Sequence, residues 1–287
     1  MRSLVLNVPS SHPLSDVSQS APLSQVFSIF NKDQTCVLVR CDSHSSILGL
    51  LDISDVVKFI ATHYRYRLDE LITLFESTEV ASITSLSHLQ PLVFVDEQQT
   101  VVELCQRLIH IRSVVVSNEE CLRLVTQLDL LKYISSQITE QDLQGVTVAK
   151  VRSRFNNTLQ TFSHTEKLFN VIVALSRSGC HSAAILSDTG ELMGNFSVTD
   201  ICSIYYQPSL LNEPVLSTVA AVRLRDPVAR LPAYHVSEHD TLFKAIEKLC
   251  KTGVSHLFLT NDSNKPNGVL TVSNVLQELL SRGLLPQ

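Results

Sequence analysis

The sequence is poor in several residue types and patterns, and each shortage narrows what the chain can be. It has no tryptophan and 8 glycines among 287 residues, so glycine-rich phosphate loops are scarce. No segment approaches the ~18 uninterrupted apolar residues of a transmembrane helix. A formal charge of -5 gives no basic surplus that would attract nucleic acid or an anionic membrane surface. We therefore expect neither a nucleic-acid nor a membrane partner.

Cysteine pairs and a secretory signal are missing as well. The seven cysteines are scattered, with no C-x-x-C pair and no histidine at the spacing of a short metal-binding motif. We therefore predict reduced thiols and no metal site. The first segment, MRSLVLNVPSSHPLS, has five apolar residues before Pro9, too few for the hydrophobic part of a signal peptide. These observations predict a cytoplasmic or nuclear protein.

Local catalytic signatures are also missing. The sequence contains no G-x-S-x-G, no G-x-x-x-x-G-K-[ST], no H-E-x-x-H and no G-x-G-x-x-G pattern. Serine, aspartate and histidine are common enough that a triad of distant residues stays open. We nevertheless predict that the chain is not an enzyme, with no catalytic residues and no catalytic cofactor.

The chain does contain an internal repeat, and 44 % apolar residues provide material for its core. Each copy has a short apolar strand, a turn rich in Ser and Thr, and an apolar run at helical spacing. The copies are GLLDISDVVKFI from Gly49, LRLVTQLDLLKYI from Leu122, GNFSVTDICSIY from Gly194 and GVLTVSNVLQEL from Gly268. A carboxylate or amide precedes each helical run, at Asp55, Asp129, Asp200 and Asn274, with spacings of 74, 71 and 74 residues. These side chains are predicted N-caps, because their oxygens can accept a first-turn N–H.

Further elements precede each of these junctions. Apolar strands are predicted over 36–41, 113–117, 182–187 and 256–260. Helices are predicted before three of them, over 99–111, 164–179 and 240–253, and after Pro22 in the first repeat. The unit is therefore helix, strand, strand, helix, and the fold class is α+β. We place a flexible leader at 1–20 and the repeats at 21–66, 83–140, 146–207 and 221–284, with linkers over 63–80 and 208–232.

A unit of about 60 residues that ends in G-h-h-T/S-x-x-D-h, where h is apolar, resembles the CBS domain. Four such units in one chain resemble the nucleotide-sensing gamma subunit of AMP-activated protein kinase and its yeast and plant relatives. The resemblance implies four CBS repeats packed as two Bateman modules in a disc-like arrangement. It also implies a regulatory, energy-sensing subunit that binds AMP, ADP or ATP. Its implied partners are a protein kinase catalytic subunit and a bridging beta-type subunit.

The resemblance also implies which residues bind the nucleotide. In CBS pairs the junction carboxylate accepts hydrogen bonds from ribose hydroxyls, and basic side chains bind the phosphate. The implied ribose ligands are Asp55, Asp129, Asp200 and Asn274. The implied turn hydroxyls are Ser54, Thr126, Ser197, Thr199, Thr271 and Ser273. The implied phosphate ligands, at the start of the middle strand, are Arg112, His181 and His256.

The four copies are not equivalent, and this leaves alternatives open. Asp52 replaces the usual Thr or Ser and adds a negative charge beside Asp55, whereas Asn274 has no charge. We therefore expect at most two or three competent sites. The junction residues can instead serve only as helix caps and turns, and the histidines only as strand residues. Further arginines can face a central channel, or can be solvated or paired with surface carboxylates, namely Arg152, Arg154, Arg223, Arg225 and Arg230.

Two other functions also stay open at this point. One is an interaction scaffold with the CBS architecture but little ligand dependence, which the missing arginines, Asp52 and Asn274 favour. The other is a sensor of a different adenosyl ligand, such as S-adenosylmethionine. That ligand would explain weak phosphate recognition while keeping the ribose carboxylates.

Overall fold

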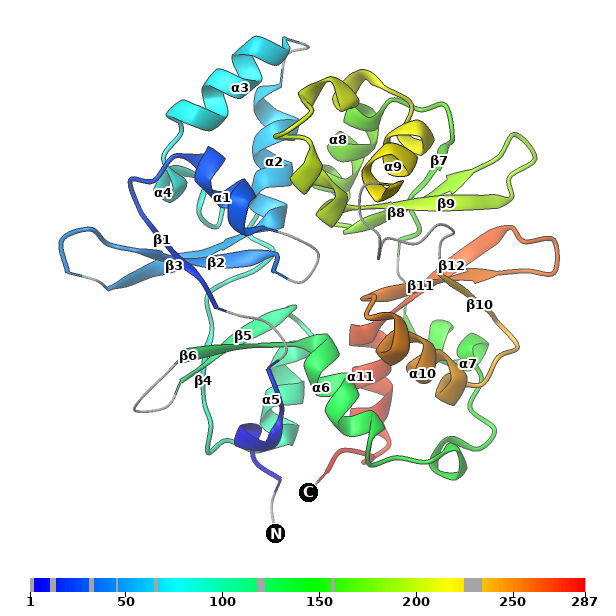
Figure 1. Cartoon of the computed structure of the whole chain (residues 1–287). Helices are drawn as coiled ribbons and strands as arrows, with labels where there is room; N and C mark the ends of the chain where they lie inside the picture. The colour runs from blue at the N-terminus through cyan, green and yellow to red at the C-terminus, as the bar shows by residue number, and fades with distance from the viewer. Residues whose placement is uncertain are drawn as a thin grey trace. The chain divides into compact units, whose positions relative to one another are not determined.

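Four small sheets define the architecture of the chain (Figure 1). The computed structural model describes residues 3–10, 14–30, 34–44, 46–64, 67–117, 122–155, 158–224 and 234–286. Within these ranges each repeat has its own three-stranded sheet, in the orders β1-β2-β3, β4-β5-β6, β7-β8-β9 and β10-β11-β12. The predicted α+β fold with four repeats is confirmed.

The repeats have the same element order. The first contains β1 (Asp16–Ser18), α1 (Leu23–Ile29), β2 (Cys36–Arg40), β3 (Ile47–Asp52) and α2 (Ile53–His63). The second contains β4 (Phe94–Asp96), α5 (Val101–Leu108), β5 (Ser113–Ser117), β6 (Leu122–Thr126) and α6 (Gln127–Ser135). The third contains β7 (Thr161–Ser163), α8 (Leu168–Ser178), β8 (Ser182–Leu186), β9 (Leu192–Ser197) and the 3-10 helix η3 (Val198–Ser203). The fourth contains β10 (His235–Ser237), α10 (Leu242–Thr252), β11 (His256–Thr260), β12 (Pro266–Thr271) and α11 (Val272–Ser281).

The first strand of each repeat was not predicted from the sequence. It has three residues and pairs in parallel with the middle strand, as Val17 does with Val39 and Val95 with Val116. The middle strand pairs antiparallel with the last. A strand of three residues is too short to show a period in the sequence, whereas its parallel partner, of five residues, is apolar throughout its centre.

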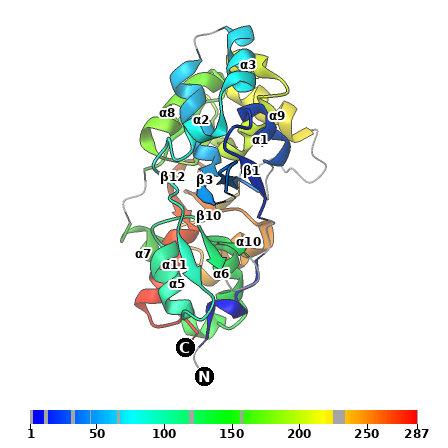
Figure 2. The ribbon, with the colours of Figure 1, turned by 90° about the vertical axis from the view of Figure 1, so that its left-hand side faces the viewer.

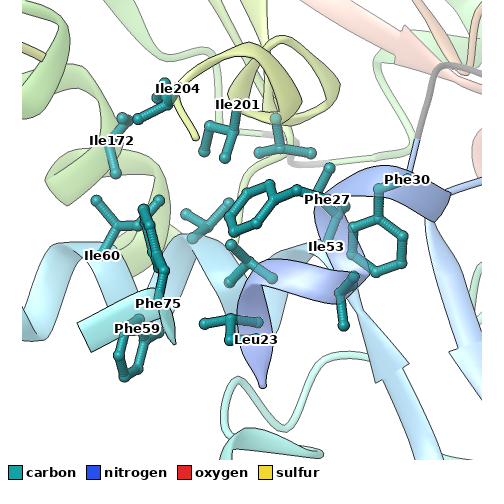
Figure 3. Close-up of a cluster of buried hydrophobic side chains, with 14 of the residues drawn as sticks. Leu23, Phe27, Phe30, Ile53, Phe59, Ile60, Phe75, Ile172, Ile201 and Ile204 are labelled. Atoms are coloured by element: carbon teal, nitrogen blue, oxygen red, sulfur yellow. The ribbon is translucent and has the colours of Figure 1, made fainter. Parts of the chain in front are cut away.

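The repeats share their cores in alternate pairs. One compact unit, here the 1/3 unit, spans Leu14–Pro91 and Gln160–Ala233 and holds the first and third repeats. In it α2 packs against α8, where Ile60 and Ile172 lie side by side, and Ile201 and Phe75 extend the cluster (Figure 3). Burial of such side chains contributes about 1.5–3 kcal/mol each to folding.

The second compact unit, here the 2/4 unit, spans Met1–Pro13, Leu92–Leu159 and Tyr234–Gln287 and holds the second and fourth repeats. Its core lies between α5, α6, α10 and α11, which both views show together (Figures 1 and 2). Leu104, Leu131, Ile246 and Leu276 are buried there. Each unit thus joins two repeats that are not consecutive in the sequence.

Each repeat is also covered by a short accessory helix. These helices are α4 (Val80–Ile83) on the first repeat, η1 (Val5–Asn7) on the second, α9 (Val215–Leu224) on the third and α7 (Val148–Arg152) on the fourth. The residue before each accessory helix bridges to the residue before the first helix of the repeat that it covers. The bridges are Glu79 to Pro22, Leu4 to Thr100, Pro214 to Lys167 and Thr147 to Thr241.

The accessory helices are exchanged within consecutive pairs. The helix η1 precedes the first repeat in the sequence but packs on the second, and α4 precedes the second but packs on the first. The same exchange relates α7 and α9 to the fourth and third repeats. The chain therefore crosses from one compact unit to the other between each accessory helix and the repeat that follows it in the sequence.

The expected flexible leader differs from the structure. Val5 and Val8 are fully buried in the core of the 2/4 unit, and the N–H of Val101 donates to the carbonyl of Ser3 at 3.0 Å. Arg123 of β6 donates to the carbonyls of Val5 (2.8 Å) and Val8 (2.5 Å). Val5 lies in η1 and Val8 directly follows it, and the Ser- and Pro-rich composition of this segment does not reveal that both are buried.

The remaining helices lie between the repeats. They are α3 (Leu68–Ser77), η2 (Glu140–Leu143) and η4 (Pro208–Asn212). The described parts of the expected linkers over 63–80 and 208–232 therefore contain helices joined by short non-helical segments. Among the described residues, every helix is too short or too polar to cross a bilayer.

Candidate ligand-binding junctions

Each junction joins the last strand of a repeat to its final helix beside the start of the middle strand. The N–H of the first helical residue donates to the carbonyl of the residue before the middle strand. These pairs are Ile53 to Thr35, Gln127 to Arg112, Val198 to His181 and Val272 to Ser255, at 2.8–3.0 Å. Arg112 and His181 therefore occupy equivalent positions, and His256 stands one residue later. The structure places all three at the junction of their own repeat.

The N-caps lie three residues earlier than the sequence analysis predicted. They are Asp52, Thr126, Ser197 and Thr271. The residues predicted as N-caps, Asp55, Asp129, Asp200 and Asn274, are the N3 partners of capping boxes. In this motif the N3 side chain reaches back to the backbone N–H of the N-cap residue. The earlier assignment was therefore wrong by three residues.

The junctions of the second and fourth repeats have the same geometry. Asp129 Oδ2 accepts from the N–H of Thr126 at 2.9 Å and from its hydroxyl at 2.8 Å. Asn274 Oδ1 accepts from the N–H of Thr271 at 3.0 Å and from its hydroxyl at 2.8 Å. The replacement of a carboxylate by an amide thus removes the charge and keeps the cap.

In the first repeat, backbone N–H groups of the chain bind both oxygens of the junction carboxylate. Asp55 is 1 % exposed, and its Oδ2 accepts from the N–H of Asp52 at 2.9 Å. Its Oδ1 accepts from the N–H of Ser87 at 2.7 Å, in the segment that follows α4. That segment contains two non-glycine residues in the left-handed region, Ser85 (φ 63°) and His88 (φ 58°).

The electrostatics of this first junction follow from its burial. Burial raises the pKa of Asp55, and the nearby charge of Asp52 adds to the rise, whereas hydrogen bonds from the backbone of Asp52 and Ser87 oppose it. Asp52, the residue that departs from the family pattern, serves as the N-cap and accepts from the N–H of Ser54 at 2.8 Å.

The junction of the third repeat contains an ion pair. Asp200 Oδ2 accepts from the N–H of Ser197 at 2.8 Å and from Arg223 Nη2 at 3.1 Å. Arg223 belongs to α9, and it also donates to the Asn195 carbonyl at 2.8 Å and to Asn195 Oδ1 at 3.3 Å. The two charged side chains are only 11 % and 12 % exposed.

The other arginines singled out from the sequence have protein partners where they are described. Arg154 Nη1 lies 2.7 Å from Oε2 of the buried Glu278, which also contacts Arg282. Arg152 Nη2 donates to the carbonyl of Asn267 at 2.7 Å. Arg152, Arg154 and Arg223 thus bind a backbone carbonyl and two largely buried carboxylates, and not the surface carboxylates that the sequence alternative named. Arg225 and Arg230 lie outside the described residues.

The turn hydroxyls serve mostly local bonds. Thr126 and Thr271 cap their helices, Ser197 accepts from the N–H and the hydroxyl of Thr199, and Ser273 donates to the carbonyl of Ile109 at 2.7 Å. The ring of His256 packs edge-on against Phe258 at 5.2 Å. In the part of the chain that the structure describes, no three His, Cys, Asp or Glu side chains gather at a metal-sized site.

Two of the four repeats match the family model of the CBS domain, over residues 80–136 and 223–281. The second and fourth repeats therefore match the CBS domain in sequence. The first and third repeats have the same strand order and the same capping-box junction. The resemblance seen in the sequence is confirmed.

Similar proteins cover most of the length of this chain. The chain is 21 % identical over 253 residues to the 5'-AMP-activated protein kinase subunit gamma of Saccharomyces cerevisiae. The aligned region covers 82 % of this chain and 76 % of the relative. The fold of this chain matches a Methanocaldococcus jannaschii protein proposed as an archaeal homologue of that subunit, with TM-score 0.75, 14 % identity and coverage of 96 % and 99 %. A conserved protein from Pyrococcus horikoshii matches with TM-score 0.57, 14 % identity and coverage of 97 % and 100 %. The structural matches show a shared fold.

Proposed function

We propose that this chain is a regulatory subunit that binds AMP, ADP or ATP and modulates a serine/threonine protein kinase of the AMP-activated type. The observation that carries the proposal is the fourfold junction, with an oxygen-bearing side chain at N3 of the final helix in every repeat. A carboxylate there can accept from the two neighbouring hydroxyls of a ribose. The similarity to the yeast gamma subunit supports the link to a kinase.

The second repeat is the leading site. Asp129 supplies the carboxylate, and Arg112 stands at the start of the neighbouring middle strand, where its carbonyl accepts from Gln127 at 2.9 Å. A guanidinium keeps its charge at neutral pH and can bind phosphate oxygens through two parallel hydrogen bonds. His181 in the third repeat and His256 in the fourth are weaker candidates, because a neutral imidazole donates one hydrogen bond.

Titration of the purified chain with labelled AMP, ADP and ATP tests the proposal, and Asp129→Asn is the informative variant. Asn274 shows that an amide keeps both capping bonds, so this variant should fold normally. We expect its affinity for nucleotide to fall about tenfold, since hydrogen bonds to a charged acceptor are roughly twice as strong. Competition with adenosine and S-adenosylmethionine identifies the adenosyl ligand. No saturable binding by the folded natural chain at millimolar nucleotide would reject the proposal.

The kinase partnership needs its own experiment. We propose that the chain assembles with a catalytic subunit and a bridging beta-type subunit. Purification of the tagged chain from its native extract should recover a serine/threonine kinase whose activity changes when AMP is added. Recovery of the chain without kinase activity would count against this partnership and leave nucleotide binding to be judged by titration.

A second candidate function is an interaction scaffold with little ligand dependence. It is favoured by two of the junctions, since Asp55 accepts from Ser87 and Asp200 is paired with Arg223. If this function is the right one, Asp129→Asn leaves partner binding unchanged, and nucleotide does not raise the melting temperature of either protein.

A further inference from the structure

The carboxylate of the third junction is bound by a cation from an accessory helix. Arg223 Nη2 is 3.1 Å from Asp200 Oδ2, and the same nitrogen donates to the Asn195 carbonyl of β9 at 2.8 Å. Both charged side chains are nearly nine-tenths buried. Such a pair is fixed by several bonds in a poorly hydrated place, unlike an exposed surface pair.

A ribose would compete with this arginine. The guanidinium is a donor only, and vicinal ribose hydroxyls also act as donors toward a carboxylate. Both therefore need the lone pairs of Asp200, and the two lone pairs of Oδ2 already accept from Ser197 and Arg223. A ribose that places its two hydroxyls on both carboxylate oxygens must displace the guanidinium from Oδ2.

The place of Arg223 on its helix decides what such displacement would do. Val215 and Val219 are fully buried, so the first two turns of α9 are held by apolar packing. Arg223 lies in the last turn, and its bonds to Asp200 and Asn195 hold that end on β9. Loss of these bonds would free the last turn while the rest of α9 stays packed.

The first repeat has a related arrangement. There Oδ1 of Asp55 accepts from the N–H of Ser87, in the segment that follows its accessory helix α4. In the 1/3 unit, both junction carboxylates are thus bound by a group from the connecting segment that follows the repeat. A backbone amide does this in one repeat and a guanidinium in the other.

We infer that Arg223 is an internal occupant of the third junction, which competes with the nucleotide for Asp200 and couples ligand binding there to release of the end of α9. The inference rests on the proposed function, because it concerns the same ligand. It makes Arg223 a residue that lowers the affinity of one site and transmits its occupancy to the connection between repeats 3 and 4.

The test uses Arg223→Met with Arg152→Met as a matched control. Arg152 also ends an accessory helix and donates to a strand carbonyl, but this bond goes to Asn267 and does not involve the junction side chain. Adenosine is the probe, because it carries the ribose without phosphate. Hydrogen exchange of the peptides around Asp200 and Arg223 during the titration reports on this site alone.

We expect Arg223→Met to bind adenosine at the third junction about tenfold more tightly than the natural chain, since removal of a competing state raises the competent fraction. Arg152→Met should leave that affinity unchanged. In the natural chain, saturating AMP should speed amide exchange at residues 220–224. This second measurement needs no variant and holds even if Arg223→Met folds poorly.

The outcomes separate the two proposals. If the natural chain binds nucleotide, while Arg223→Met is no tighter and exchange at 220–224 does not change, the inference is overturned and the proposed function stands. A loss of AMP affinity with adenosine affinity unchanged would make Arg223 a phosphate ligand and also overturn it. If neither the natural chain nor the variants bind any adenosyl compound, the proposed function fails and the inference falls with it.

Discussion

Replacement of Gly49 by alanine would place a Cβ 2.7 Å from Thr84 Cγ2, below any distance that such carbons normally adopt. Gly49 lies in β3, and Thr84 directly follows the accessory helix α4 that covers this strand. Gly194 is the corresponding residue of β9, but a Cβ there would meet Leu216 Cδ1 at 3.6 Å, an ordinary contact. The two glycines therefore form a matched pair.

The expected magnitudes follow from these distances. Alanine in a strand interior is more favourable than glycine by about 0.5–1 kcal/mol, because the unfolded chain loses less freedom. Overpacking against a branched side chain costs about 1–3 kcal/mol. We therefore expect Gly49→Ala to lower the free energy of unfolding by about 1–2 kcal/mol, and Gly194→Ala to raise it by about 0.5 kcal/mol.

Urea unfolding followed by circular dichroism measures both variants, since the chain has no tryptophan. Thr84→Ser removes the clashing methyl and keeps the hydroxyl that donates to the Val80 carbonyl at 2.9 Å. In the Thr84→Ser background, Gly49→Ala should therefore lower the free energy of unfolding much less than it does in the natural chain. Equal stabilities of Gly49→Ala and Gly194→Ala, or no rescue by Thr84→Ser, would refute the reasoning.

Two further predictions concern the N-terminal segment and the first junction. Val8→Ala should lower the stability of the 2/4 unit by about 1–2.5 kcal/mol, because Val8 is fully buried, while the exposed Leu6→Ala should change it by less than about 0.5 kcal/mol. Urea midpoints show the difference, and equal effects would contradict burial of this segment. The pKa of Asp55 is raised above its ordinary value of 3.8, so the folded state binds its proton more tightly than the unfolded state. Stability should therefore fall as pH rises from about 3.8 through the raised pKa, and Asp55→Asn should remove this part of the pH dependence, with Asp142→Asn as an exposed control. Identical pH profiles of the natural chain and Asp55→Asn would contradict the assignment.

Much of the fold could be read from the sequence because it recurs. The middle strands are continuous apolar runs at a regular spacing, and the structure has them within one residue of the prediction. The third final helix is a 3-10 helix rather than an α-helix, a difference that the pattern after Asp200 does not show. The three-residue first strands carry no period that could reveal them.

The site was less predictable for physical reasons. Aspartate is favoured both at the N-cap and at N3, so the identity of Asp129 does not decide its position. The available signal was the Ser or Thr three residues before the Asp, because the two side chains form a capping box. The partners of Asp55 and Asp200 lie 32 and 23 residues away in the chain, and no local pattern pairs Ser87 or Arg223 with them.

The exchanged accessory helices bear on how the chain can be divided and synthesised. A cut between the second and third repeats keeps every accessory helix with the repeat that it covers, but it separates α2 from α8 and α6 from α10. During synthesis the first two repeats emerge with their accessory helices complete. At that stage α8 and α10, which cover the apolar faces of α2 and α6, have not yet been made. We therefore expect the N-terminal half alone to expose these faces and to aggregate. On this expectation, each half of the chain needs the other to bury these helix faces.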